Sequence, residues 1–437
     1  MTSNPNDWSD QSWHIKSVRI LDPFTGVDSE GDIYVENGHF IDYPTAKMTV
    51  VDARGLWAVP RLTDMHVHFR EPGQEHKEDL LSGSRAAAAG GFTVVATMPN
   101  TDPVIDIPAL VDWQIRRGQE IGLVEIWPLG AVTKGSRGQE LAEMGMMQRA
   151  GAVGFSDDGH AVGQARLMRA ALSYATTLGH PIIQHAEDRD LSQGSVMHEG
   201  QVSSRLGLPG VPGVAESSMV WRDVELSLLT GGPLHVAHVT APGSLEALHY
   251  AGTRGAHVTA EAAPHHLFLT DQAVAEWKAD PVTKVNPPLR PEAFRQALVD
   301  AVVSGLVSVI ATDHAPHHRD EKNAPYLEAP YGISGLETSV GTVLTALLHS
   351  GRMTPLELMA RMTLGPHRAL MMDYPGIVPG ARADLTLIDP YHRWTVDPKQ
   401  FYSRGKNTPM MGVELTGRAV GTMLQGKWTM REGEVLG

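Results

Sequence analysis

Hydrophobic residues in the middle of the chain form short continuous runs, and several of these runs finish in a residue able to bind a metal. Such runs end at His66, His185, His238 and Asp313. Continuous apolar runs are typical of parallel strands buried on both faces. Helix-like stretches separate the runs, and this alternation favours βα units around a parallel sheet.

With the segments 92–98, 122–128, 152–156 and 257–261, the pattern predicts about eight βα units, the number that closes a (β/α)8 barrel of the TIM type. In such a barrel the carboxyl ends of the strands meet at one face. The polar residues that end the runs are therefore expected to converge there. Residues 58–376 are predicted to form this domain.

The two ends of the chain show a different pattern, in which short alternating segments are separated by turn signals. Asn37-Gly38 stands between two such segments and is a strong β-hairpin signal. Similar alternation appears in residues 383–389 and 417–428. Residues 1–57 and 377–437 are therefore predicted to pair as one small β-sandwich built from both chain ends.

Composition narrows the class of protein. A chain of 437 residues, 42% of them hydrophobic, is long enough for one large domain and a smaller one. It has no cysteine, so disulfides are excluded and any metal needs nitrogen and oxygen ligands. A net charge of −14 argues against a nucleic-acid partner, which requires a basic surface.

Neither a membrane segment nor a secretory signal is expected. The first residues, Met1 to Asp7, are polar and lack the apolar core of a signal peptide. The chain also has no uninterrupted apolar stretch of about 18 residues. The expectation is a cytoplasmic protein that does not associate with membranes.

His66 and His68 form a His-x-His pair directly after an apolar run. On a strand, residues i and i+2 share a face, so both imidazoles can reach one metal ion. Alone this signal is weak, because a chain with 21 histidines contains such pairs by chance. Four apolar runs that end in possible ligands form a more specific pattern.

These residues lie in motifs that resemble the metal-dependent amidohydrolases and, within them, the class I dihydroorotases of prokaryotic type. The resemblance extends along the whole chain and is carried by 64–73 (DMHVHFREPG), 76–79 (HKED), 98–101 (MPNT), 155–159 (FSDDG), 184–188 (QHAED), 284–290 (KVNPPLR), 311–317 (ATDHAPH) and 376–389.

The resemblance implies two zinc ions per chain, bridged by Asp158 and a hydroxide. It assigns one ion to His66, His68 and Asp313 and the other to His185 and His238, with Asp158 reaching both. Asp157 is the alternative bridge, but neighbouring strand residues point in opposite directions, and the spacing of the motif favours Asp158. Many relatives carry a carboxylated lysine as the bridge. Lys134 is rejected for that role because of its glycine-flanked setting.

The activity implied is the reversible cyclisation of N-carbamoyl-L-aspartate to L-dihydroorotate in pyrimidine biosynthesis. Asp313 is the expected proton-transfer residue. The expected substrate-binding residues are Arg70, which can clamp a carboxylate bidentately, Asn100, Asn286 and His317. Simpler interpretations remain for two of them: Arg70 as a surface ion-pair residue, and Asn100 as a turn residue.

Other functions stay open at this stage. A dihydropyrimidinase or hydantoinase normally has a bridging lysine where residues 155–159 stand, and an allantoinase differs around Asp313. A silent homologue that only partners aspartate carbamoyltransferase would usually have lost ligands, whereas every candidate ligand is present here. A homodimer, and a complex with aspartate carbamoyltransferase, are further expectations from the resemblance.

The polar stretch 314–332 lacks helical or strand periodicity and is predicted to be a lid that orders over substrate and supplies His317. A solvated charge run is the simpler explanation of its charges. His265 and His266 also match the family, but they are expected to pack near the site rather than to bind metal.

Overall fold

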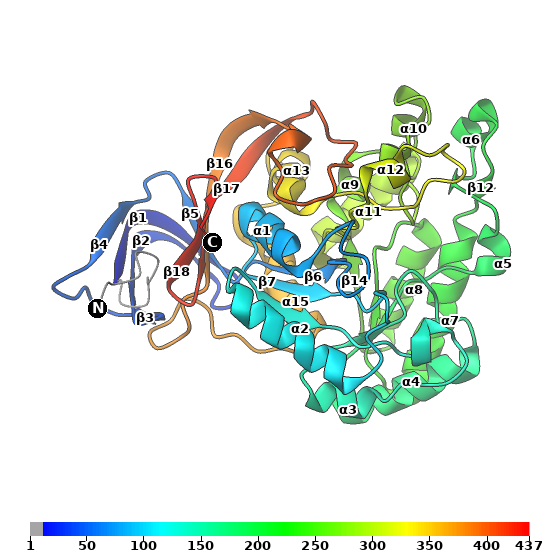
Figure 1. The fold of residues 1–437 in the computed structure, drawn as a ribbon, viewed down its shortest axis with the longest axis horizontal. Helices are drawn as coiled ribbons and strands as arrows, with labels where there is room; N and C mark the ends of the chain where they lie inside the picture. The colour runs from blue at the N-terminus through cyan, green and yellow to red at the C-terminus, as the bar shows by residue number, and fades with distance from the viewer. Residues whose placement is uncertain (1–11, 437) are drawn as a thin grey trace.

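The computed structural model of the protein describes residues 12–436 (Figure 1). The polar segment Met1 to Asp7, on which the prediction about a secretory signal rests, lies outside the described residues. Strands contributed by both chain ends lie together on one side, and most of the helices surround the other part (Figure 1).

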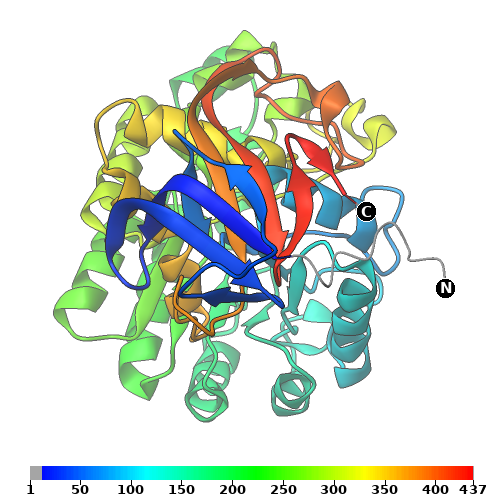
Figure 2. The ribbon, with the colours of Figure 1, turned by 90° about the vertical axis from the view of Figure 1, so that its left-hand side faces the viewer.

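Both chain ends form one nine-stranded sheet in the order β19-β18-β17-β16-β5-β1-β2-β3, with β4 paired to β1. β5 and β16 run antiparallel and join the N-terminal strands to the C-terminal ones (Figure 2). Because β5 continues to Pro60, the sheet extends past residue 57. Its strands are β1 (Trp13–Asp22), β2 (Val27–Glu36), β3 (His39–Ile41), β4 (Thr49–Asp52), β5 (Trp57–Pro60), β16 (Leu385–Thr395), β17 (Glu414–Leu424), β18 (Lys427–Arg431) and β19 (Glu434–Val435).

The predicted hairpin at Asn37-Gly38 is confirmed. β2 and β3 run antiparallel with Glu36 opposite His39, which leaves a two-residue turn. Asn37 and Gly38 have φ values of 51° and 78°. Two consecutive residues with positive φ define the turn whose twist matches that of the strands, and Asn-Gly adopts it with little strain.

The sheet curls so that its distant strands share a core. The rings of Trp13 in β1 and Trp428 in β18 pack edge to face with centroids 5.9 Å apart. The indole N–H of Trp13 donates to the carbonyl of Gly426 at 3.0 Å. Side chains from both chain ends therefore bury one apolar cluster. Trp13 and Gly426, which meet there, are 413 residues apart in the sequence.

The remaining strands are parallel and form two hydrogen-bonded groups, β6-β7-β8 and β15-β14-β13-β10-β9. Single parallel bridges, Val67 to His314 and Gly130 to Phe155, connect the edges of these groups. The strands are β6 (Thr63–Val67), β7 (Val94–Thr97), β8 (Glu125–Pro128), β9 (Phe155–Ser156), β10 (Ile182–Gln184), β13 (Leu234–Val236), β14 (Val258–Ala262) and β15 (Val309–Ile310); β11 (Met197–His198) and β12 (Gly210–Val211) pair separately.

Helices connect consecutive parallel strands, as the alternation in the sequence predicts. They are α1 (Leu80–Gly90), α2 (Pro108–Ile121), α3 (Met144–Arg149), α4 (Ala165–Leu178), α5 (Arg189–Ser192), α6 (Gln201–Leu206), α7 (Val214–Thr230), α8 (Pro242–Thr253), α9 (Pro264–Phe268), α10 (Gln272–Glu276), α11 (Glu292–Ser304), α12 (Arg319–Lys322), α13 (Ser339–Val343), α14 (Pro355–Met362) and α15 (Leu364–Ala369). Short helical turns are η1 (Lys134–Ser136), η2 (Pro281–Thr283), η3 (Leu336–Thr338), η4 (Leu344–Leu348) and η5 (Pro398–Gln400).

Helix α1 illustrates how local sequence sets these bounds. The Asp79 carboxylate accepts the backbone N–H of Ser82 and completes a capping box at the start of the helix. Gly91 ends the helix at φ 95°, in the left-handed region. A Cβ there would lie 2.7 Å from Cβ of Ala419 and 2.9 Å from Cγ2 of Thr386, so glycine allows the helix to pack against the sheet.

All the parallel strands deliver their polar end residues to the same edge, because their carboxyl ends point the same way. His66 lies within β6, His185 follows β10 directly, and His238 and Asp313 lie shortly after β13 and β15. None of the helices within residues 12–436 has the length and apolarity needed to cross a membrane.

Candidate metal centre

Five side chains from four strand ends meet in two buried groups, each with ligand atoms within 4.8 Å of one another. The first group is His66, His68 and Asp158, and the second is Asp158, His185 and His238. Asp158 belongs to both groups. Parallel strands separated by as many as 172 residues of sequence (His66 to His238) thus place four imidazoles around one carboxylate.

Asp158, rather than Asp157, faces the histidines. Its carboxylate oxygens lie 3.6 Å from Nε2 of His66 and 3.4 Å from Nε2 of His68. Asp157 instead accepts the backbone N–H groups of Val132 and Thr133 at 2.9 and 3.0 Å. Its side chain therefore holds the segment after β8 and does not point toward the metal-binding groups.

Neighbouring acceptors set the tautomers of the first pair of histidines. His66 Nδ1 lies 2.5 Å from Glu261 Oε1, and His68 Nδ1 lies 2.9 Å from Asn100 Oδ1. When each Nδ1 carries the proton and donates it to these oxygens, each Nε2 keeps its lone pair. Both Nε2 atoms face Asp158, so the two lone pairs point at the same place.

The second pair of histidines meets nitrogen to nitrogen. His185 Nδ1 lies 2.9 Å from His238 Nε2, and the same two atoms lie 3.6 and 3.7 Å from Asp158 Oδ1. His185 Nε2 lies 3.1 Å from the Glu187 carboxylate, which accepts its proton. His185 Nδ1 is thereby left as a lone pair directed at His238 and Asp158, the arrangement required of a metal ligand.

Asp313 approaches the first group from the end of β15. Its Oδ1 lies 3.3 Å from His68 Nε2 and 3.5 Å from His66 Nε2. It is not a member of either group whose atoms lie within 4.8 Å of one another. Its backbone has a φ of 50°, in the left-handed region. Asp313 thus faces the cavity beside the first group.

The acids create a strongly negative site that attracts positive charge. Burial lowers the pKa of His66, but Glu261, Asp158 and Asp313 outweigh burial and hold this pKa well above its usual value. Burial also opposes the charged form of His185, yet the neighbouring carboxylates of Asp158 and Glu187 raise the pKa of His185 to about 10. Burial favours the neutral form of Asp158, but the histidines hold its pKa well below the usual range.

Unpaired buried atoms test whether a metal fits here. His66 Nε2 and Asp158 Oδ1 are buried without a hydrogen-bond partner. A buried polar atom without a partner is costly, and such atoms call for an ion, a water or a functional explanation. Both atoms lie where the two groups meet, and the donor set of imidazole nitrogens and carboxylate oxygens suits zinc. The residues present therefore fit a metal.

A cavity of about 160 Å³ opens over these groups. Its lining includes Arg70, Asn100, Asn286 and His317, the four residues predicted to bind substrate. Arg70 Nε donates to the Pro316 carbonyl at 3.3 Å, and burial lowers the pKa of Arg70 to about 10 while leaving it a cation at neutral pH. The lining of the cavity thus combines members of the two candidate metal-binding groups with a buried cation.

Asn286 and His317 take defined positions in this wall. The Asn286 amide donates to Glu187 at 3.1 Å, and His317 Nε2 donates to the Tyr331 carbonyl at 2.7 Å. Burial, with Arg70 and other cations nearby, holds the pKa of His317 far below its usual value, so its ring is neutral.

The stretch 314–332 contributes Ala315, His317, Tyr331 and Gly332 to the lining of the cavity and contains the short helix α12. Lys322 is buried and donates to the carbonyls of Pro330 and Gly332, both at 2.9 Å. Lys284 donates to the Ala329 carbonyl at 2.7 Å. Two lysines thus fasten the segment that carries Tyr331. Ordering of this segment by substrate stays a prediction.

Sequence reasoning assigned no role to Glu261 or Glu187, although both touch ligand histidines. Glu261 ends the apolar run 257–261, just as His66, His185, His238 and Asp313 end the other runs. Its position at a strand end was the feature of the sequence that could have indicated a role near the site. Lys134 lies away from the centre, its Nζ 3.3 Å from a carboxylate oxygen of Glu140 at the surface. His266 Nε2 donates to the Pro287 carbonyl at 2.8 Å and is not a member of either group.

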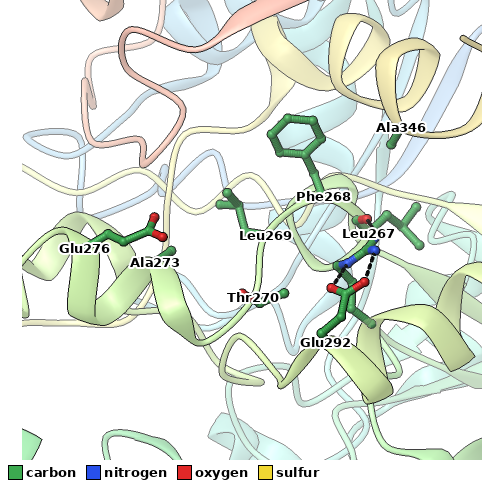
Figure 3. Close-up of a pocket in the computed structure, with 9 residues that line it drawn as sticks. Leu267, Phe268, Leu269, Thr270, Ala273, Glu276, Glu292 and Ala346 are labelled. Atoms are coloured by element: carbon green, nitrogen blue, oxygen red, sulfur yellow. Dashed lines mark hydrogen bonds and ion pairs between the residues drawn. The ribbon is translucent and has the colours of Figure 1, made fainter. Parts of the chain in front are cut away.

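A larger cavity, about 400 Å³, lies between α9, α10 and α11 (Figure 3). Its wall includes Leu267, Phe268 and Leu269, and its cation, Arg295, is paired with Glu292 at 2.5 Å. It contains none of the residues that form the two metal-binding groups. Size alone therefore does not select the candidate site, because members of the two groups line the smaller cavity.

Comparison with known proteins agrees with this geometry. A family profile described as Dihydro-orotase-like matches residues 55–244. A dihydroorotase of Pelotomaculum thermopropionicum is 48% identical over 96% of this chain and 98% of its own length. A dihydroorotase of Pelobacter propionicus is 47% identical over 95% of this chain and 99% of its own.

The solved structures that share this fold are named as hydantoinases and dihydropyrimidinases. An L-hydantoinase of Arthrobacter aurescens superposes with a TM-score of 0.85 at 24% identity, covering 97% of both chains. A dihydropyrimidinase of Brevibacillus agri gives a TM-score of 0.83 at 18% identity, covering 98% of this chain and 96% of its own. These likenesses show that the chain has the same α/β fold as those two proteins. By its near full-length identity to the curated relatives, the chain belongs to the dihydroorotases, which are hydrolases acting on cyclic amides.

Proposed function

We propose that this protein interconverts N-carbamoyl-L-aspartate and L-dihydroorotate, using the cavity above the two metal-binding groups. The observation that carries the proposal is the convergence of His66, His68, His185 and His238 on Asp158, next to the buried cation Arg70. A metal-binding centre beside a receptor for a carboxylate suits a cyclic amide that bears a carboxylate.

The metal is proposed to be zinc, with two ions per chain. His66, His68 and Asp313 would hold one ion, His185 and His238 the other, and Asp158 would contact both. When bound, zinc supplies positive charge that polarises the amide carbonyl and activates water. The unpaired Nε2 of His66 and Oδ1 of Asp158 support this assignment.

Asp313 is proposed to carry the proton. Burial favours its neutral form, but His66 and His68 outweigh burial and lower the pKa of Asp313, so its carboxylate is ready to accept a proton. In ring opening it would take a proton from the attacking water and return it to the departing ring nitrogen. Ring closure uses the same group in reverse.

Substrate orientation is assigned to residues on the other walls of the cavity. The Arg70 guanidinium would pair with the substrate carboxylate, with the Asn100 amide and the neutral His317 ring beside it. Asn286 would hydrogen-bond the ring edge from the wall next to His185. These contacts would place the scissile amide over Asp158 and exclude weakly bound water.

The architecture proposed for the site is a closed (β/α)8 barrel. It is supported by the bridges Val67 to His314 and Gly130 to Phe155, which link the two groups of parallel strands at both edges. Residues 58–376 are proposed as this barrel, and 1–57 with 377–437 as the sandwich. A homodimer in the cytoplasm, able to contact aspartate carbamoyltransferase, is proposed on the family resemblance alone; light scattering of the purified protein with and without that enzyme would test both associations.

Two measurements on the purified protein test the function. Metal analysis should find about two zinc ions per chain, and a chelator should remove both the zinc and the turnover of dihydroorotate, with recovery on adding zinc back. Turnover of dihydroorotate should exceed that of hydantoin, dihydrouracil and allantoin. A preference for an uncharged ring would favour a hydantoinase, and full metal loading without turnover of any ring would favour a silent homologue.

A further inference from the structure

Glu261, at the end of β14, is a buried acid to which the proposed chemistry assigns no part. Only 1% of its side chain is exposed. Oε1 lies 2.5 Å from His66 Nδ1, and the same oxygen accepts the backbone N–H of His238 at 3.2 Å. His66 belongs to the first metal-binding group and His238 to the second. One carboxylate oxygen therefore contacts both groups.

The contact with His66 determines which of its nitrogens is free. An ionised carboxylate only accepts hydrogen bonds, so His66 must carry its proton on Nδ1. Its Nε2 then has a lone pair and points toward Asp158 and Asp313. A carboxylate partner on the second nitrogen of a ligand histidine fixes the orientation of the ring and increases its basicity.

The contact with His238 acts on the backbone. His238 has a φ of 30°, a left-handed conformation that is strained for a residue with a side chain. Glu261 makes two hydrogen bonds to this part of the backbone. Its side chain accepts the N–H of His238, and its backbone carbonyl accepts the N–H of Val239 at 2.9 Å. The direction in which the His238 ring leaves the chain thus depends on Glu261.

His235 keeps the carboxylate in place. Its Nε2 lies 3.1 Å from Glu261 Oε2, and its Nδ1 lies 2.8 Å from the hydroxyl of Thr259. The His235 ring has no exposed surface. With one oxygen facing the ligands and the other facing His235, the carboxylate has a single orientation that satisfies all of its partners.

We propose that Glu261, oriented by His235, is a positioning residue that prepares both metal-binding groups for a divalent cation at once, through the ring of His66 and the backbone of His238. This inference rests on the proposed metal centre. It differs from a general structural role because the two groups are expected to lose affinity together.

The test is a titration of the metal-stripped full-length protein with Co²⁺, followed by its visible absorption and by competition with a chelator. Glu261→Gln is the first variant, since it keeps the side-chain volume but removes the negative charge that increases the basicity of the His66 ring and leaves one acceptor oxygen where the carboxylate has two. Loss of a partner of this kind typically weakens metal binding 10- to 100-fold. Both dissociation constants are expected to rise by about that factor, with an altered Co²⁺ spectrum and unchanged circular dichroism of the metal-free protein.

Two further variants make the result specific. His235→Gln should produce a smaller loss in the same direction, and little extra loss when added to Glu261→Gln, because it acts through that residue. Glu337→Gln is the matched control: this partly buried acid accepts the backbone N–H groups of Tyr402 and Ser403 and belongs to neither metal-binding group. It should alter stability and leave Co²⁺ affinity unchanged.

The outcomes separate failure of the proposed metal centre from failure of the positioning role of Glu261. If the unaltered protein binds no Co²⁺, the proposed metal centre itself fails. If it binds two ions and Glu261→Gln binds them equally well, or loses only one, the positioning role is overturned while the metal centre stands. If Glu261→Gln does not fold, His235→Gln decides alone, and unchanged affinity for both ions overturns the proposal.

Discussion

The side-chain oxygen of Asn100 lies 2.9 Å from Nδ1 of His68, so Asn100 orients the ring of a proposed metal ligand as well as lining the cavity. Asn100 follows β7, and His68 follows β6, the adjacent strand. An amide oxygen at this distance accepts the imidazole proton and leaves Nε2 free for a cation.

Replacing Asn100 with alanine is expected to weaken metal binding about tenfold as well as to reduce turnover, because the His68 ring loses its partner. Asn100→Asp keeps an acceptor oxygen and should retain most of the metal affinity. Zinc affinity measured by chelator competition separates the two variants. Equal affinities for both would mean that Asn100 contacts only the substrate.

Asp313→Asn is expected to reduce turnover by about 10²- to 10⁴-fold, because an amide cannot accept the proton of the attacking water. Much of the zinc should remain, since His66, His68 and Asp158 are unchanged. Metal content and the initial rate of dihydroorotate hydrolysis are the two measurements. A variant that keeps its metal and most of its rate would remove Asp313 from the proton-transfer role.

Arg70→Gln is expected to weaken productive binding of dihydroorotate by about 1.5 to 3 kcal/mol, the value typical of a lost charged hydrogen bond, or about ten- to a hundredfold in kcat/KM. The effect should fall on substrates that bear a carboxylate. Dihydrouracil, which lacks this group, is the control substrate. A similar loss for both rings would contradict the clamp, and Arg70→Lys would show whether charge without the planar fork is enough.

His198 is expected to make the fold sensitive to acid. Its Nδ1 accepts a hydrogen bond from Arg290 at 3.0 Å, and burial, reinforced by that cation, lowers the pKa of His198 to about 4. Between pH 6.5 and 4 the His198 side chain binds a proton in the unfolded chain but not in the folded one. The free energy of unfolding therefore decreases as pH falls through this window.

His198→Asn keeps an acceptor for Arg290 and removes the titration. Urea unfolding of the metal-stripped proteins at pH 7 and pH 5 should show the unaltered protein losing about 2 kcal/mol more than the variant. Using the difference between the two proteins cancels the other titrating groups. Parallel losses would show that His198 is not responsible.

Much of the candidate site can be predicted from the sequence, because an apolar run that ends in a histidine or an acid is visible within a few residues of the chain. The apolar runs before His185 and His238 predict strands, and strand polarity alone then sends both rings to one edge. The Asn37-Gly38 hairpin is equally local, because two residues with positive φ suffice to set it. These inferences needed no knowledge of the rest of the chain.

Other features depend on contacts between segments far apart in sequence. The contacts of Asp157 with Val132 and Thr133 turn it away from the centre, and nothing within 155–159 reveals those partners. The two chain ends were expected to pair with each other, and the strand that joins them is β5, which pairs with both β1 and β16. Alternation reports which face of a strand is buried but not which strand lies beside it.

What the sequence determined by itself was the kind of chemistry: imidazoles and carboxylates at the ends of buried strands, with no thiol in the chain, allow a metal centre of nitrogen and oxygen ligands. Tertiary structure decided which lone pairs point inward. The tautomers of His66 and His68 depend on Glu261 and Asn100, each brought into place by a different strand. A hydrogen bond requires a distance and an angle between two atoms, and for residues 195 positions apart only the folded chain sets these.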